Sequence, residues 1–152
     1  MLRDAGYTPT VEVLESGPVA LGPADAEVLG VDAGGPAFRT VKRWLADGRA
    51  AMVAVDVIPS EDPVDVERLD PGAGLFELVR RIRGVGAEWE LAWPGAALAP
   101  AAVRRWLDLP TRSAVLTLDL IGVSRRGDRV YRAMEYQVPG FVRPGFVRSV
   151  RQ

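Results

Sequence analysis

The chain has 152 residues, enough for one domain with a sizeable core, and its 48% hydrophobic and 26% charged residues are ordinary for a soluble globular protein. It contains no cysteine and no histidine, which excludes disulfides, thiolate and imidazole metal ligands, cysteine nucleophiles and histidine-based triads. A formal net charge of −1 gives no general attraction for nucleic acid, and no apolar run approaches the ~18 residues of a membrane-spanning helix. We therefore expect a soluble, cytoplasmic protein that needs no metal or cofactor and does not bind DNA by itself.

The beginning of the chain predicts a short strand and a short helix. Residues 1–10 are polar and linker-like. Apolar and acidic residues alternate over residues 11–15, which predicts a strand that ends at Gly17–Pro18. A helix is expected to begin at Pro23, where a missing N–H is tolerated, and to end at Gly30.

A β-hairpin is predicted around Asp47 and Gly48, because both residue types tolerate the positive φ that tight hairpin turns require. Its strands are expected at Ala37–Leu45 and Ala50–Ile58. The second strand has few polar residues, which indicates that both of its faces are largely covered. Pro59 ends it, since proline cannot donate a hydrogen bond to a neighbouring strand.

The middle of the chain predicts a loop, two helices and a strand. Residues 60–74 are rich in proline, aspartate and glycine and are typical of a surface loop. The following segment LFELVRRIR has apolar residues at helical spacing, with arginines opposite, and predicts an amphipathic helix that ends at Gly84 and Gly86. A strand is expected at Glu88–Trp93, and a second short helix from Pro100.

A second hairpin is expected near the end of the chain, with strands at Ala114–Val123 and Val130–Val138. The turn glycines of the two hairpins are 79 positions apart, and Asp56 lies the same 79 positions before Glu135. This matched spacing predicts a pseudo-duplicated antiparallel sheet. The tail, interrupted by Pro144, can supply a last edge strand.

The order strand, helix, hairpin, helix, strand, helix, hairpin predicts an α+β domain with helices packed on an antiparallel sheet. In the same order, the segments AEVLGVDAGGP, KRWLADGRA, GLFELV and AAVRRWLDL resemble the UTRA domain, the effector-binding half of HutC-type GntR bacterial transcription regulators. This resemblance implies a chorismate lyase-like fold, with a linker-like segment at 1–10 and a ligand-binding and dimerisation domain at 11–152.

The resemblance also implies partners. Such domains bind a small-molecule effector, here expected to be an organic acid, a sugar phosphate or an amino-acid-like compound, and they form homodimers. They normally follow a winged helix-turn-helix domain. DNA contact is therefore expected only through such a domain, which we expect to be absent from this chain.

The resemblance further implies where a ligand would bind. In relatives that bind phosphorylated sugars, basic residues before the first hairpin turn hold the anion, and Lys42 and Arg43 occupy that part of this sequence. Trp44 shares a strand face with Lys42, whereas Arg43 points the other way. In the family, backbone amides at the start of the long helix also receive the anion. That place is Gly72–Phe76 in this sequence, and Gly74 and Phe76 are the ligand residues expected from it. Solvated hairpin charges and an ordinary loop-to-helix junction are the alternative interpretations.

The acidic positions of the family pattern differ in this sequence. Ala54 stands where a glutamate is usual, with Asp56 one same-face step further on. Tyr131 stands at the second glutamate position, with Glu135 two same-face steps further on, and Gln137 replaces a usual tyrosine. These departures put a phosphosugar in doubt but leave a pocket at the same place, where the two acids would bind ligand hydroxyls or amines. Capping strand ends or pairing with arginines are the alternatives for both.

Three functions are open at this point. The first is an effector-sensing, dimerising domain that is not an enzyme, and the second is an enzyme of the chorismate lyase type. The second needs basic groups for two carboxylates, and the expected strands carry few. The third is a degenerate domain that only dimerises. Four aromatic residues are expected in a core or interface rather than around a ligand: Phe38, Trp89, Trp93 and Trp106.

Overall fold

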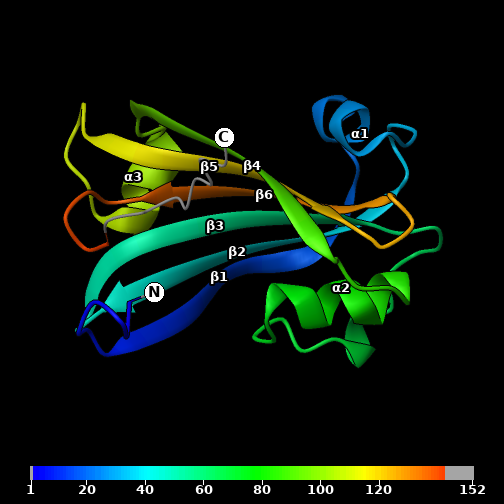
Figure 1. Cartoon of the computed structure of the whole chain (residues 1–152), viewed down its shortest axis with the longest axis horizontal. Coiled ribbons are helices and arrows are strands. Elements are labelled where there is room, and N and C mark those ends of the chain that lie inside the picture. Colours follow the sequence, from blue (N-terminus) through cyan, green and yellow to red (C-terminus); the bar gives the residue numbers. More distant parts are fainter. Residues whose placement is uncertain (1, 143–152) are drawn as a thin grey trace, which may run out of the picture.

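The computed structural model describes residues 2–142, which form a six-stranded antiparallel sheet and three α-helices (Figure 1). The elements follow the predicted order, with one added 3₁₀ turn in the loop before the second helix. Their bounds are β1 Pro9–Ala20, α1 Pro23–Leu29, β2 Pro36–Ala46, β3 Arg49–Pro59, η1 Val66–Arg68, α2 Leu75–Arg83, β4 Trp89–Leu98, α3 Ala101–Leu107, β5 Ala114–Val123 and β6 Arg129–Gln137. The predicted α+β class and antiparallel sheet are confirmed.

The two predicted hairpins meet at the centre of the sheet, whose strand order is β1-β2-β3-β6-β5-β4. The central strands β3 and β6 pair Ala54 with Glu135 and Asp56 with Ala133. A shift of 79 positions converts Ala54 to Ala133 and Asp56 to Glu135, so the pairing is the same when read from either strand. The two halves of the sheet are therefore related by an approximate two-fold axis, and this axis relates Asp56 to Glu135.

The predicted turns and helix ends are also confirmed. Asp47 and Gly48 both have positive φ, 49° and 79°, as the hairpin turn requires. α1 and α2 end at Gly30 and Gly84, with φ of 70° and 68°. The Asp47 carboxylate also accepts a hydrogen bond of 2.8 Å from the Thr8 backbone N–H, which joins the start of β1 to the turn.

The predicted ends of the two edge strands were wrong. β1 was expected to end at Gly17–Pro18 but continues to Ala20, and β4 was expected to end at Trp93 but continues through Pro94 to Leu98. Both strands lie at edges of the sheet, where a proline removes no ladder bond if its nitrogen faces outward. A proline is therefore a weaker end signal in an edge strand than in a central one.

The segment before β1 packs against the end of the first hairpin. Leu2 is buried beside Ala46 and Ala51, and Phe141 packs on the same cluster. The division of the chain at residue 10 stays a prediction. The predicted last edge strand falls mainly on residues 143–152, which lie outside the described residues.

The helices cover opposite faces of the sheet. α3 packs against Val53 and α1 against Val57, on one face of β3. α2 packs Leu78 against Ile58, on the other face, because successive strand residues point to opposite sides. α1 and α2 lie near one end of the sheet and α3 near the other (Figure 1). None of the helices in residues 2–142 is long and apolar enough to cross a membrane.

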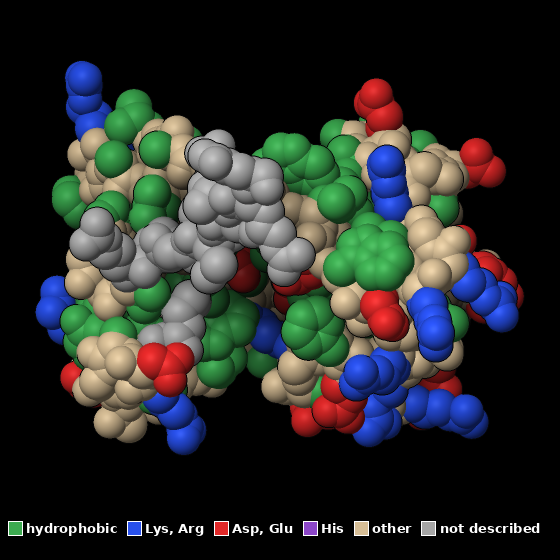
Figure 2. All heavy atoms as spheres, in the orientation of Figure 1, with side chains coloured by type: hydrophobic (Ala, Val, Ile, Leu, Met, Phe, Trp, Pro, Cys, Tyr) green, Lys and Arg blue, Asp and Glu red, His purple; other side chains and the backbone are tan. Residues whose placement is uncertain are grey.

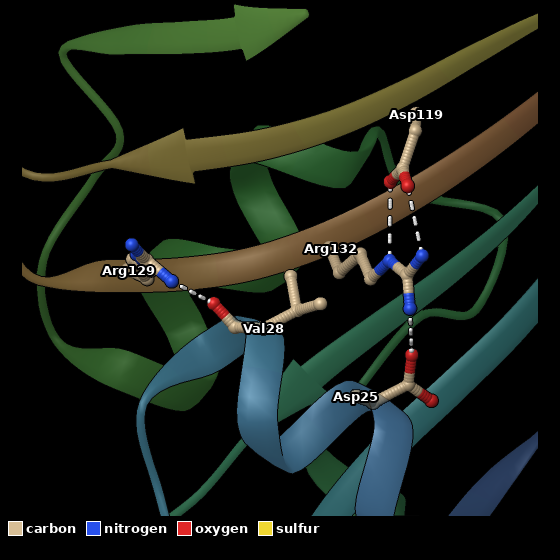
Figure 3. A network of polar contacts seen from close by, with 5 residues as sticks. All are labelled: Asp25, Val28, Asp119, Arg129 and Arg132. Atoms are coloured by element: carbon tan, nitrogen blue, oxygen red, sulfur yellow. Dashed lines mark hydrogen bonds and ion pairs between the residues drawn. The ribbon is translucent and has the colours of Figure 1, made fainter. Parts of the chain in front are cut away.

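An arginine of β6 fixes α1 to the sheet (Figure 3). The Arg132 guanidinium donates two hydrogen bonds, of 3.1 and 2.8 Å, to the Asp119 carboxylate on β5, and a third, of 2.9 Å, to Asp25 on α1. Arg129 adds a hydrogen bond to the Val28 carbonyl. The two carboxylates raise the pKa of Arg132 above its ordinary value. This network lies on the face opposite α2.

Candidate functional site

A cavity of about 380 Å³ lies between the sheet and the start of α2, and we call it the α2 cavity. Residues 72–76 form one wall, and every strand of the sheet contributes at least one side chain to the rest. Figure 2 shows acidic and basic side chains at the floor of a hollow in this face. Larger hollows exist, including one of about 500 Å³, but that one is lined by the surface loop after β3 and by the end of α2. Buried charged groups distinguish the α2 cavity.

The sheet supplies a floor of small residues with charged residues beside them. Lys42, Ala54 and Glu135 lie side by side in one row across β2, β3 and β6. Neighbouring strands are about 4.8 Å apart, so the Cα atoms of Lys42 and Glu135 are separated by roughly 10 Å. Asp56 and Ala133 lie next to each other in the adjacent same-face row. The two alanines leave space that larger side chains would fill.

Lys42 is the only basic residue among the described residues that line this cavity, and it is 3% exposed. Its ammonium donates a hydrogen bond to the Ala73 carbonyl, in the loop that leads into α2. Burial lowers the pKa of Lys42, and the nearby carboxylates of Asp56 and Asp70 partly oppose that effect. A lysine ammonium has three N–H donors, so this contact leaves capacity for a ligand.

Asp56 and Glu135 are acids kept in a poorly solvated place. Burial raises the pKa of Asp56 to about 6, although the Thr40 hydroxyl donates to its carboxylate at 3.0 Å and Lys42 lies near. Burial also raises the pKa of Glu135, whose carboxylate accepts a 2.9 Å hydrogen bond from the Gln137 amide. Buried charges of this kind are unfavourable unless they are compensated, and they concentrate at functional sites.

The start of α2 offers backbone donors to the cavity. Gly74 is the N-cap of α2 and makes no side-chain cap, while its carbonyl accepts the N–H groups of Glu77 and Leu78 at 3.0 and 3.1 Å. The amides of the first turn precede these two and point out of the helix end. Phe76 lines the cavity and is 51% exposed, which places an aromatic ring at its mouth.

Tyr131 does not line the cavity, although sequence reasoning included it among the ligand residues. Its side chain is fully buried in the core, and its hydroxyl donates to the Glu90 carboxylate on β4. Burial and Glu90 raise the pKa of the Tyr131 hydroxyl. The ring lies over Gly122, where an added Cβ would come within 2.0 Å of it. Tyr131 thus positions Glu90, which does line the cavity and which sequence reasoning missed.

Arg43 and Gln137 also lie outside the cavity lining. Arg43 points to the opposite face, as its place in the strand predicted, and donates to the Glu12 carboxylate and to the Trp106 carbonyl. It therefore connects β1, β2 and the end of α3. Gln137 reaches the cavity only through its hydrogen bond to Glu135. The structure thus brings together six of the predicted residues: Lys42, Trp44, Asp56, Gly74, Phe76 and Glu135.

Comparison of the sequence with protein families and of the fold with solved structures points to one family of proteins. The family model described as the UTRA domain matches residues 4–136. The effector domain of PhnF from Mycobacterium smegmatis is 17% identical, with a TM-score of 0.77 over 91% of this chain and 85% of that one. The longer PhnF structure is 17% identical, with a TM-score of 0.84 over 98% of this chain and 66% of that one.

A third structure, a GntR-family transcriptional regulator from Bacillus cereus, is 11% identical, with a TM-score of 0.80 over 93% of this chain and 99% of that one. At these identities the structural matches establish the fold. The chain spans about two thirds of the longer PhnF chain. No curated protein sequence matches it.

Proposed function

Because the chain belongs to the UTRA domain family, we propose that it is the effector-binding and dimerisation domain of a HutC-type GntR regulator and that the α2 cavity is its effector site. The observation that carries this proposal is the burial of Lys42 and Asp56, with the half-buried Glu135 beside them, around an open space. A folded protein gains no stability from such an arrangement, so a ligand that compensates the charges is the physical reason for keeping it.

Signalling in this proposal is a shift between two arrangements of the domain. The Lys42 ammonium holds the Ala73 carbonyl, so the loop before α2 and the sheet are connected across the cavity. A ligand that contacts both walls binds best when α2 lies close to the sheet. It therefore favours that arrangement by its difference in affinity for the two states. In the bacterial cytoplasm, this shift would change how the winged-helix domains of the regulator are placed and therefore how they bind DNA.

Binding, rather than catalysis, is what the lining supports. An enzyme of the chorismate lyase type needs basic groups for two substrate carboxylates, and a shared fold does not transfer activity. The described lining has one lysine and three carboxylates, Asp56, Glu90 and Glu135. We therefore propose that the domain is not an enzyme.

The proposed homodimer is supported by the exposed edge strand β4. Four of its large apolar side chains, Trp89, Leu91, Trp93 and Leu98, are 41 to 61% exposed. Trp89 and Trp93 are thus not in the core of this chain, whereas Phe38 is. Among residues 2–142 no strand pairs with the outer edge of β4, and an exposed edge with such side chains is an aggregation risk unless a partner covers it. We propose that a second copy of the chain does so.

The test of the effector site is a thermal-shift screen with amino acids, organic acids, sugar phosphates and chorismate. A compound at about 100 times its dissociation constant adds roughly 2.7 kcal/mol of stability, which is readily measured. A hit should lose its effect in Glu135→Ala and Lys42→Met and keep it in Arg105→Ala, a change outside the cavity. If no compound stabilises the folded domain, or if hits bind both cavity variants unchanged, the proposed site is wrong.

A further inference from the structure

The α2 cavity, taken as the effector site proposed above, carries an unequal charge. The described residues that line it include one base, Lys42, and three acids, Asp56, Glu90 and Glu135. Asp70, in the loop before α2, adds another carboxylate near Lys42. A dianionic ligand such as a sugar phosphate would meet one cation and several like charges in a poorly solvated space.

Each charge is held by a neutral partner instead of by one of opposite sign. Lys42 donates to the Ala73 carbonyl, Asp56 accepts from the Thr40 hydroxyl, and Glu135 accepts from the Gln137 amide. Among the described residues, no ion pair connects Lys42 with any of the acids that line the cavity. The neutral partners fix the side chains in place, and the attraction between Lys42 and Asp56 compensates their charges only in part.

The pseudo-two-fold relation of the sheet places two of the acids suitably for one cation. Asp56 and Glu135 lie on adjacent strands and are offset by two residues, because Asp56 pairs with Ala133 and Glu135 with Ala54. Such diagonal neighbours lie about 7–8 Å apart, and their Cβ atoms are somewhat closer. One ammonium group that donates to two carboxylates needs oxygens roughly 5 Å apart, a separation that these two side chains can span.

We propose that the α2 cavity binds a small molecule whose protonated amine lies between Asp56 and Glu135 and whose hydrogen-bond-accepting end faces Lys42. The roughly 10 Å between the Cα atoms of Lys42 and Glu135 accommodates such a bipolar ligand across the small side chain of Ala54. The exposed ring of Phe76 and the indole of Trp44 supply apolar contact for its body. The ligand class is therefore an amino acid or another amine with an acceptor group, in place of a phosphorylated sugar.

Proton release follows from this arrangement. An ammonium beside Asp56 and Glu135 lowers the pKa of both, so binding at pH 6 expels protons. With a pKa of about 6, Asp56 is ionised to roughly one tenth at pH 5 and nine tenths at pH 7, so the affinity should rise about tenfold over that range. The charged or titratable groups that interact with Asp56 are Lys42 on β2 and Glu135 and Tyr131 on β6, and Glu90 on β4 lines the same cavity.

The test uses the whole chain and pairs of compounds that differ in one group. Amino acids and ω-amino acids such as 5-aminopentanoate are compared with their hydroxyl analogues, and glucose 6-phosphate and chorismate are included. Amines should raise the melting temperature and their hydroxyl analogues should not. Glu135→Gln should weaken amine binding at least tenfold, while the matched control Glu15→Gln on β1 should not change it.

Titration calorimetry of the best amine at pH 6, in two buffers of different ionisation enthalpy, measures the protons released without any substitution. Release of protons supports the proposal. Stabilisation by anions or neutral sugars but not by amines, or amine binding without proton release, overturns it and leaves the proposed function standing. If no compound of the panel binds the folded chain, the proposed function fails and this inference fails with it.

Discussion

Replacing Asp56 with asparagine is expected to stabilise the domain at neutral pH, although it removes a cavity residue. The Asp56 side chain is 3% exposed, and burial raises the pKa of its carboxyl from 3.8 to about 6. An acid with a raised pKa in the folded state holds its proton more tightly there than in the unfolded chain. The free energy of unfolding therefore falls as the pH rises from about 4 to about 6, and the loss is complete above that range.

The size of the effect follows from the same values. The difference between 3.8 and about 6 corresponds to roughly 3 kcal/mol of lost stability when the carboxylate is charged. Asparagine keeps an acceptor for the Thr40 hydroxyl, but it removes the favourable field that Asp56 provides for Lys42. We therefore expect a net gain of about 2 kcal/mol at pH 8 and almost none at pH 4. For a domain of this size that is a rise of about 4–8 °C in melting temperature.

Urea unfolding of both proteins at pH 4, 6 and 8, followed by tryptophan fluorescence, measures this difference. Asp119→Asn is the matched control, because that carboxylate accepts two hydrogen bonds from Arg132 and its neutralisation should destabilise the domain. A lower free energy of unfolding for Asp56→Asn at pH 8, or an equal effect of the substitution at pH 4 and pH 8, would contradict this expectation.

Three further changes test other parts of the structure. Gly122→Ala places a Cβ 2.0 Å from the ring of Tyr131 and should lower the free energy of unfolding, measured by urea titration, by about 3 kcal/mol or more. In the control Gly17→Ala the added Cβ meets nothing within 4 Å, so the loss should be less than about 1 kcal/mol, and equal losses would contradict the packing of Tyr131 on Gly122. Arg132→Gln leaves the partly buried carboxylates of Asp25 and Asp119 without their cation, so we expect the free energy of unfolding to fall by about 1–2 kcal/mol in the same assay. An unchanged free energy of unfolding would show that this network does not hold α1 on the sheet. Trp93→Glu should convert the proposed dimer to a monomer, as measured by light scattering, while the free energy of unfolding changes by less than about 1 kcal/mol. A dimer that persists in this variant would exclude β4 as the interface.

Local features of the fold could be read from the sequence because a few adjacent residues decide them. Asp47 and Gly48 adopt the positive φ that their turn requires, and Gly30 and Gly84 end their helices as expected. The edge strands could not be delimited in this way. Whether Pro94 ends a strand depends on which neighbour, if any, faces its nitrogen, and that neighbour lies far away in the sequence.

Part of the candidate site was also accessible, because strand periodicity determines which residues share a face. That rule placed Lys42 and Trp44 on one face of their strand and Arg43 on the other, as the structure shows, whereas Asp56 was assigned to the same pocket from the family resemblance. Sequence reasoning put Tyr131 in the pocket as well, since the rule says nothing about depth. The structure places the Tyr131 side chain in the core, where its hydroxyl positions Glu90.

By itself, then, the sequence determined the order of elements, the turns and the face on which each strand residue lies. Only the tertiary structure decided that α2 covers this face, that β4 brings Glu90 to it, and that Asp56 and Glu135 end as diagonal neighbours. The physical reason is that periodicity and turn chemistry act within a few residues. Depth, strand register and the charge of a cavity arise from contacts between segments that the chain brings together only on folding.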